Sequence, residues 1–119
     1  MTFTSNPLPY TDLSVEQLGR QMAAPQGDWQ LIDVREPEEL ALASLEGFVN
    51  LPLSQFAQWS ETIRSQFDAH QPTAVLCHHG HRSAQMCLWL AQQGFTHLHN
   101  VTGGIDAYAL VVDPSVPRY

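Results

Sequence analysis

Short apolar runs alternate with amphipathic stretches along the chain. Four of these runs, bounded by turn residues, are typical of short buried strands, at residues 30–34 (QLIDV), 48–52 (FVNLP), 73–76 (TAVL) and 97–101 (HLHNV). Helices are predicted around them, at residues 14–22, from residue 37 onward, at 83–93 and at 105–110. Strands that alternate with helices predict an α/β fold with a mostly parallel sheet.

Local signals mark where several helices begin and end. Ser14 and Gln17 have the spacing of a capping box, in which each side chain bonds a backbone N–H at the start of a helix. Pro37 suits the first turn of the next helix, because a helix leaves its first N–H groups unpaired and proline lacks one. Ser83 is expected at the N-cap or in the first turn of the third helix, which Gly94 ends.

A stripe of large apolar residues predicts one more helix. Trp59, Ile63 and Phe67 recur every four residues, which places them on one helix face directed into the core. Two connections also have recognisable signals. Residues 25–28 are expected to form a turn, and the proline-containing segment 113–119 is expected to be extended.

Size and charge exclude several classes of partner. The chain has 119 residues, 44% of them hydrophobic, which predicts one folded domain over residues 1–119. Its formal net charge of -7 argues against nucleic acid and anionic membranes. No apolar run approaches the roughly 20 residues that cross a bilayer, and the N-terminal MTFTSNPLPY lacks the regions of a signal peptide. We therefore expect a cytoplasmic protein with no nucleic-acid or membrane partner.

The acidic residues are unevenly distributed. All six histidines and Arg82 lie between Asp68 and Asp106, a window without Asp or Glu. Two explanations stay open at this point. Buried strands and helices commonly lack acids, or the window holds a site that must tolerate an anion or a thiolate.

The stretch LCHHGHRS, residues 76–83, concentrates reactive side chains between a predicted strand and a predicted helix. Such a loop lies outside the carboxyl end of a parallel strand, where the helix N-terminus offers unpaired N–H groups. Cys77 sits at this point, so its thiolate should be stabilised. Gly80 allows a positive φ, and Arg82 adds a cation whose planar fork suits an oxyanion.

A metal site is one interpretation of this stretch. Cys77 and the three loop histidines, His78, His79 and His81, are ligand types that zinc accepts. Their spacing is poor, because neighbouring side chains of a tight loop point apart when its amides point inward. We therefore predict no metal. The loop histidines are expected to tune local charge and to shift the pH optimum, since an imidazolium near Cys77 favours the thiolate.

Two other interpretations of this stretch are a cysteine phosphatase and a binding module. A cysteine phosphatase also holds a thiolate in an amide cradle, but its loop has five residues between cysteine and arginine. Here four residues separate Cys77 from Arg82, and Ser83 occupies the place a phosphatase needs as arginine. The smaller cradle fits a sulfane sulfur better than a phosphate. A binding or regulatory module of the same fold is a further alternative, although such domains commonly lack the cysteine.

Four segments together resemble one enzyme family. The sequence C-x-x-G-x-R-S at residues 77–83 resembles the active-site loop of single-domain rhodaneses. Residues 31–39 (LIDVREPEE), 46–53 (EGFVNLPL) and 94–108 (GFTHLHNVTGGIDAY) resemble three further segments of that family, in the same order. The resemblance implies a rhodanese-like α/β fold, with a small, mostly parallel five-stranded sheet and helices on both faces.

The resemblance also implies sulfur transfer without a bound cofactor. Cys77 would attack the outer sulfur of a small anionic donor such as thiosulfate and carry that sulfur as a transient persulfide. The residues implied to bind the substrate are those of the loop, His78, His79, Gly80, His81, Arg82 and Ser83.

Residues outside the loop have more than one interpretation. The family pattern suggests that Asp33 and Arg35 support the loop from a neighbouring strand, while the alternative is a turn and ion pair on the rim. Cys87 lies on an apolar helix and is predicted to be a core thiol. Residues 113–119 (DPSVPRY) resemble the tail of rhodanese domains fused to enzymes that adenylate sulfur carriers, which implies a sulfur-carrier or thiol protein as acceptor.

Overall fold

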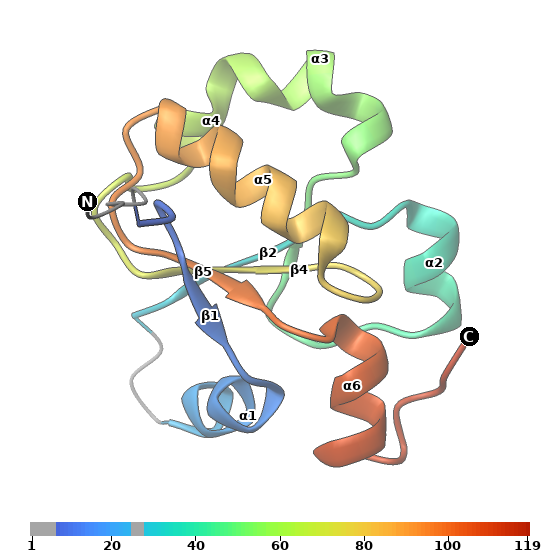
Figure 1. Ribbon diagram of the computed structural model, residues 1–119. Coiled ribbons are helices and arrows are strands. Elements are labelled where there is room, and N and C mark those ends of the chain that lie inside the picture. The colour runs from blue at the N-terminus through green and yellow to red at the C-terminus, as the bar shows by residue number, and fades with distance from the viewer. Residues whose placement is uncertain (1–6, 25–27) are drawn as a thin grey trace, which may run out of the picture.

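A five-stranded sheet, parallel throughout, separates two layers of helices in the computed structural model, which describes residues 7–24 and 28–119 (Figure 1). The strand order is β1-β5-β4-β2-β3. The strands are β1 (Thr11–Leu13), β2 (Gln30–Asp33), β3 (Val49–Asn50), β4 (Thr73–Leu76) and β5 (Leu98–Val101). The α/β fold with a parallel sheet is confirmed, and β4, which leads to Cys77, lies at its centre.

The strands match the apolar runs to different degrees. β4 has the predicted limits, and β2 and β5 differ from the prediction by one residue each. β3 is much shorter than the apolar run at 48–52, because Pro52 cannot donate to a ladder and the pairing covers only Val49 and Asn50. β1 was not predicted. Only one of its three residues, Leu13, is buried, so this segment contains no apolar run.

The helices have the predicted order. They are α1 (Val15–Ala23), α2 (Pro37–Leu42), α3 (Phe56–Trp59), α4 (Ile63–Gln66), α5 (His81–Gln92) and α6 (Gly104–Val111). The capping box is present, since Ser14 and Gln17 exchange backbone–side-chain hydrogen bonds of 2.9 and 3.1 Å. Pro37 is the first residue of α2, and Ser83 lies in the first turn of α5. In the described part of the chain, no helix is long and apolar enough to span a bilayer.

The stripe of Trp59, Ile63 and Phe67 is buried, but not on one continuous helix. A 3₁₀ helix at Ser60–Thr62 separates α3 from α4. The Thr62 hydroxyl donates to the Trp59 carbonyl at 3.3 Å, and such side-chain bonds compete with the regular helical ladder. The core prediction is confirmed, and the prediction of one helix is wrong.

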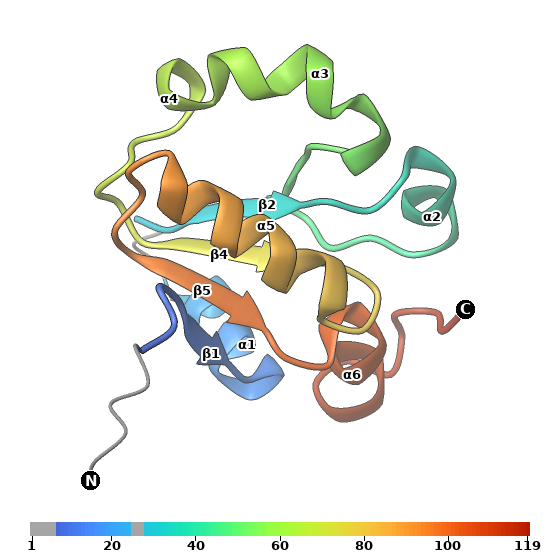
Figure 2. The ribbon, with the colours of Figure 1, turned by 45° about the horizontal axis from the view of Figure 1, so that its top comes forward.

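Two apolar layers hold the sheet. One lies under α3, α4 and α5 (Figure 2) and contains Cys77 and Cys87. The other lies against α1 and α6 on the opposite face and contains Leu18, Val101 and Ile105. With both faces covered, the central strand β4 is buried at every position, as expected of a parallel sheet.

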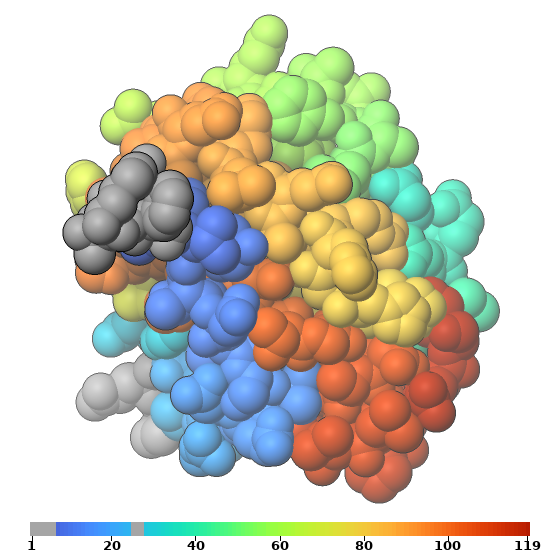
Figure 3. All heavy atoms as spheres, in the orientation of Figure 1, coloured from blue at the N-terminus to red at the C-terminus, as the bar shows by residue number. Residues whose placement is uncertain are grey.

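Two expected connections had different outcomes. The turn predicted at 25–28 falls largely on residues 25–27, which lie outside the described residues. The segment 113–119 is not simply extended, because the backbone N–H groups of Ser115 and Val116 bond Asp113 in a turn. After this turn the chain runs toward α2 and the loop that follows β4. Figure 3 shows this red segment beside them.

Candidate active site in the loop from Cys77 to Ser83

Cys77 lies immediately after the central strand, in the loop that enters α5 (Figure 1). Its side chain is buried, with 1% of its surface exposed. The backbone N–H groups of Gly80 and Ser83 donate to the Cys77 sulfur, at 3.1 and 3.3 Å. Two N–H groups directed at one sulfur stabilise it when it carries negative charge. The predicted amide cradle is therefore present at these two positions.

Gly80 gives the loop its sharp bend. It has a φ of +102° and is the N-cap of α5. A side chain at this position would come within 3.2 Å of the backbone nitrogen of Gly103. The loop therefore needs glycine both for its backbone conformation and for its close approach to the segment that enters α6.

The first turn of α6 holds the other side of the loop. The N–H of Ile105 donates to the Cys77 carbonyl at 3.0 Å, and the N–H of Asp106 donates to the His78 carbonyl at 3.2 Å. These N–H groups have no partner within their own helix, so the loop carbonyls satisfy them. Gly104 lies so close to the loop that an added Cβ would be 2.3 Å from the His78 carbonyl oxygen.

Asn100, on β5, links three parts of the cradle, although its only sequence signal is that of a polar residue in a predicted strand. Its Nδ2 donates to the Gly80 carbonyl at 3.2 Å, which directs its Oδ1 toward the Ser83 hydroxyl at 2.5 Å. The Ser83 hydroxyl also lies 3.2 Å from the Cys77 sulfur. With its one hydrogen given to Asn100, Ser83 faces the sulfur with a lone pair and accepts from the thiol.

Asn100→Asp is expected to suppress the reactivity of Cys77. An aspartate keeps the acceptor for Ser83, repels the Gly80 carbonyl and places a negative charge beside the developing thiolate. We expect iodoacetamide to alkylate Cys77 at least about tenfold more slowly at pH 7.5. The control is Asn50→Asp, because Asn50 lies on β3 and bonds the backbone carbonyls of Asp33 and Arg35. Equal alkylation rates in wild type and Asn100→Asp would contradict this role of Asn100.

Arg82 does not point into an open anion site. Its Nη1 and Nη2 bond the two carboxylate oxygens of Glu39, on α2, at 2.6 and 2.9 Å. The bonds from Arg82 hold the pKa of Glu39 at about 2, so this carboxylate stays charged at neutral pH. Glu39 was missing from the candidates because 43 residues separate it from Arg82. The substrate-binding role of Arg82 stays a prediction, with this carboxylate as the competing partner.

Asp33 and Arg35 are buried and do not lie on the rim. The Arg35 guanidinium bonds the Asp33 carboxylate, with Nη2 and Oδ2 2.8 Å apart, and both side chains are at most 1% exposed. Arg35 also donates to the hydroxyl of Tyr119 at 2.9 Å, and that hydroxyl donates to Glu39 at 2.8 Å. The pair is thus connected to the partner of Arg82 through Tyr119, a contact that supports the prediction of a bracing role.

The three loop histidines lie in different environments. The His78 ring stacks on Tyr119, with ring centroids 3.9 Å apart and planes inclined by 5°. His79 is 56% exposed with its Nδ1 3.9 Å from Asp106, and His81 is exposed. Across residues 7–24 and 28–119, no group of three or more His, Cys, Asp or Glu side chains is arranged to hold a metal ion.

Comparison with known proteins agrees with this arrangement. The family model of the rhodanese-like domain matches residues 14–110. The chain belongs to the rhodanese-like domain family. The family resemblance of the four segments is thereby confirmed.

Relatives of this rhodanese-like domain include proteins of different lengths. Rhodanese-like/PpiC domain-containing protein 12, chloroplastic, from Arabidopsis thaliana is 49% identical over 113 residues, which are 93% of this chain and 38% of the relative. Most of that relative thus has no counterpart in this chain. Thiosulfate sulfurtransferase GlpE from Vibrio cholerae is 30% identical over 96 residues, which are 81% of this chain and 87% of the relative.

Solved structures have the same fold. A rhodanese-related protein from Thermoplasma volcanium superposes with a TM-score of 0.72 at 27% identity, over 92% of this chain and all of the other. The human single-domain sulfurtransferase TSTD1 superposes with a TM-score of 0.69 at 22% identity, over 84% of this chain and 96% of the other. The fold of this rhodanese-like domain is therefore shown by both sequence and structure.

Burial sets the charge of His78 in this rhodanese-like domain. Burial lowers its pKa below the ordinary 6.5, with a smaller contribution from His79. His78 is therefore neutral at neutral pH and supplies no imidazolium to Cys77. The influence of the loop histidines on the pH optimum stays a prediction.

His78→Phe is expected to weaken the dependence of folding stability on pH. Because the folded pKa of His78 lies below the unfolded value, the unfolded state binds more protons as the pH falls through about 6.5. Wild type should therefore lose stability between about pH 7 and pH 5, and the variant should lose less. Urea unfolding of both proteins at several pH values measures this. A difference in unfolding free energy that stays constant over this range would contradict the lowered pKa of His78.

Cys87 is the core thiol that the sequence predicted. It is fully buried on α5, and burial raises its pKa to about 12. A thiol with this pKa is protonated at neutral pH and reacts slowly as a nucleophile. Of the two cysteines, Cys77 alone combines a place in the loop with backbone donors to its sulfur.

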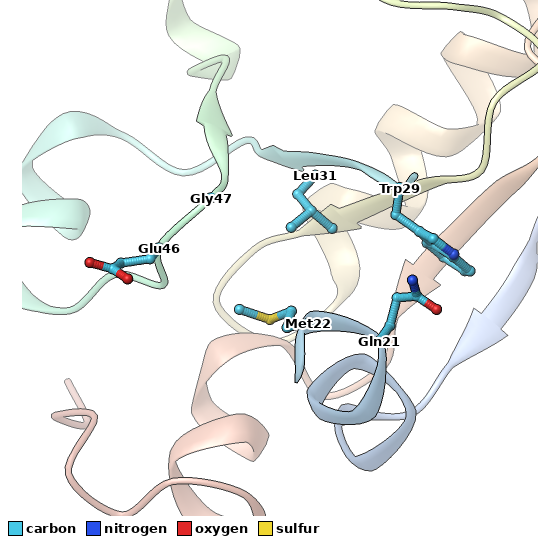
Figure 4. Close-up of a pocket in the computed structure, with 6 residues that line it drawn as sticks. All are labelled: Gln21, Met22, Trp29, Leu31, Glu46 and Gly47. Atoms are coloured by element: carbon cyan, nitrogen blue, oxygen red, sulfur yellow. The ribbon is translucent and has the colours of Figure 1, made fainter. Parts of the chain in front are cut away.

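A separate cavity lies away from the loop (Figure 4). It has a volume of about 410 Å³ and is lined by side chains including Met22, Trp29 and Leu31. These residues lie at the end of α1 and the beginning of β2, so the cavity is at the amino ends of the strands. Cys77 lies at the carboxyl end of β4, and the cavity is therefore not part of the cradle around its sulfur.

Proposed function

We propose that this rhodanese-like domain is a sulfurtransferase that carries sulfane sulfur as a persulfide on Cys77. The observation that carries the proposal is the sulfur of Cys77 at the carboxyl end of the central strand, with the N–H groups of Gly80 and Ser83 directed at it. This arrangement stabilises an anionic sulfur, whether thiolate or persulfide. The name of the Vibrio cholerae relative, a thiosulfate sulfurtransferase, supports thiosulfate as a donor to try first.

The proposed reaction has two steps. The Cys77 thiolate attacks the outer sulfur of thiosulfate, the S–S bond breaks, and sulfite leaves with the bonding electron pair. A nucleophilic acceptor then attacks the outer sulfur of the persulfide and regenerates the thiolate. Splitting the transfer in this way is nucleophilic catalysis, and it needs no bound cofactor.

The acceptor in the cell is proposed to be a thiol protein or a sulfur-carrier protein. Cyanide replaces it in the test tube and leaves as thiocyanate. A cytoplasmic location also stays a proposal, and the word chloroplastic belongs to the Arabidopsis relative.

The proposal is tested by following the sulfur atom. The reduced protein is mixed with thiosulfate, freed of excess donor and measured by intact mass, and cyanide is then added. We expect a gain of one sulfur atom on the protein, its loss on cyanide addition and an equal amount of thiocyanate. A protein that gains no sulfur from thiosulfate or from an organic persulfide would refute the proposed function.

A further inference from the structure

We propose that Glu39 determines donor specificity by occupying Arg82, so that the site favours an organic persulfide with an uncharged substituent over dianionic thiosulfate. This inference rests on the proposed sulfurtransferase function. It concerns which donor the cradle accepts.

The contacts of Glu39 leave Arg82 little freedom. Both carboxylate oxygens are engaged by the guanidinium, at 2.6 and 2.9 Å, in the two-pronged geometry that arginine would otherwise offer to an oxyanion. Glu39 is itself held in place, because it accepts from the Tyr119 hydroxyl at 2.8 Å and from the Glu36 backbone N–H at 3.1 Å. A donor anion would have to displace this fixed carboxylate to reach Arg82.

The other arginines near the loop are paired in the same way. Arg35 bonds Asp33, and Arg118 bonds Asp106 at 2.9 Å. His78 does not replace them, because burial lowers its pKa. Among the residues that the structure describes, every arginine around the cradle is thus matched by a carboxylate. The whole chain carries a net charge of -7, which further opposes a dianion.

A donor with an uncharged organic substituent avoids both the displacement of Glu39 from Arg82 and the repulsion by the negatively charged protein. In a hydropersulfide R–S–SH the outer sulfur is bonded to sulfur and hydrogen, and the inner sulfur to carbon. The Cys77 thiolate attacks the outer sulfur, the S–S bond breaks, and the thiolate RS⁻ leaves with the electron pair. The products are the Cys77 persulfide and RS⁻, so charge and atoms balance. The N–H groups of Gly80 and Ser83 bond the Cys77 sulfur and stabilise its negative charge, and this attack requires no contact between the donor and Arg82.

Glu39→Gln tests the inference because this variant is expected to use thiosulfate better than wild type does. Glutamine keeps the size of the side chain but removes the charge that holds Arg82. We expect the KM for thiosulfate to fall about tenfold, as for one freed charge-assisted contact. The KM for a persulfide with an uncharged substituent, such as 2-hydroxyethyl persulfide, should stay within about twofold, so the ratio of the two KM values measures specificity. A residue with a merely structural role would instead impair both donors.

Glu38→Gln is the matched control. Glu38 lies beside Glu39 on α2 and is exposed, so this variant makes the same change in net charge and leaves Arg82 paired. Both KM values should equal those of wild type. Tyr119→Phe, which removes one bond to Glu39 and keeps the ion pair, should lower the KM for thiosulfate by a smaller factor.

Three results would overturn the inference: an unchanged or raised KM for thiosulfate in folded Glu39→Gln, an equal fall in Glu38→Gln, or a wild-type protein that prefers thiosulfate to the persulfide. Failure of the proposed function is separable from these. If no variant transfers sulfur, protection of Cys77 from iodoacetamide by thiosulfate still reports anion binding. Protection that is stronger in Glu39→Gln than in wild type supports the occupation of Arg82, and equal protection refutes it. If Glu39→Gln does not fold, Tyr119→Phe decides by the same readings.

Discussion

Cys77→Ser is expected to abolish sulfur transfer and leave the fold intact. The hydroxyl of serine is a far weaker nucleophile than a thiolate and cannot form a persulfide. Serine is slightly smaller than cysteine and can keep the bonds from Gly80 and Ser83, so the loop should retain its conformation. Thiocyanate formation, intact mass after thiosulfate and thermal unfolding should show no turnover, no added sulfur and little change in Tm.

Cys87→Ser is the internal control for this experiment. Cys87 is buried and its pKa is raised to about 12, so it should take no part in the transfer. The Cys87→Ser variant is expected to gain one sulfur atom and to turn over, although a hydroxyl placed in the core will lower its stability. Sulfur loading of Cys77→Ser at wild-type level would assign the transfer to Cys87 and contradict the proposed mechanism.

Gly104→Ala is expected to produce the other large effect. The added methyl group would lie 2.3 Å from the His78 carbonyl oxygen and 2.5 Å from the Cys77 carbonyl oxygen, and Gly104 has a φ of +61°. The left-handed conformation and the clash together should cost about 2–4 kcal/mol of unfolding free energy. The loop must move to admit the methyl group. We therefore expect sulfur transfer to fall at least about a hundredfold even in molecules that remain folded.

Gly94→Ala separates backbone strain from the clash. Gly94 also has a positive φ, of +96°, but an added Cβ would meet only the end of the Arg64 side chain, at 4.0 Å. This variant should lose about 1–2 kcal/mol of stability, from the left-handed conformation, and keep its sulfur transfer. Urea unfolding and thiosulfate kinetics of the two variants measure the contrast. Equal activity in both would show that α6 does not shape the loop.

The parts of the site that the sequence predicted are those built from neighbouring residues. β4, the loop and α5 follow one another without interruption, so a buried apolar run, a glycine and an apolar helix were enough to place Cys77 at a helix N-terminus. The two N–H donors to its sulfur come from within six residues of Cys77. Local backbone geometry is well constrained by local sequence signals.

The parts that it missed depend on packing between distant segments. Glu39 meets Arg82 across 43 residues, and Tyr119 meets Glu39 across 80. Asn100 could be recognised only as a polar residue in a predicted strand, since its contacts with Gly80 and Ser83 require β5 to pair with β4. The interruption between α3 and α4 was missed for a local reason, because the spacing of three apolar residues is compatible both with one helix and with two helices separated by a 3₁₀ turn.

The bonds from the first turn of α6 to the carbonyls of Cys77 and His78 tie the reactive loop to the closing helix of the fold. The loop therefore cannot open as a small independent fluctuation, since its opening also breaks the start of α6 and exposes the apolar contacts of Ile105. Local openings of this kind follow cooperative units rather than single residues. The backbone around the Cys77 sulfur should therefore keep its conformation with nearly the stability of the whole core, so that the N–H groups of Gly80 and Ser83 stay directed at the sulfur.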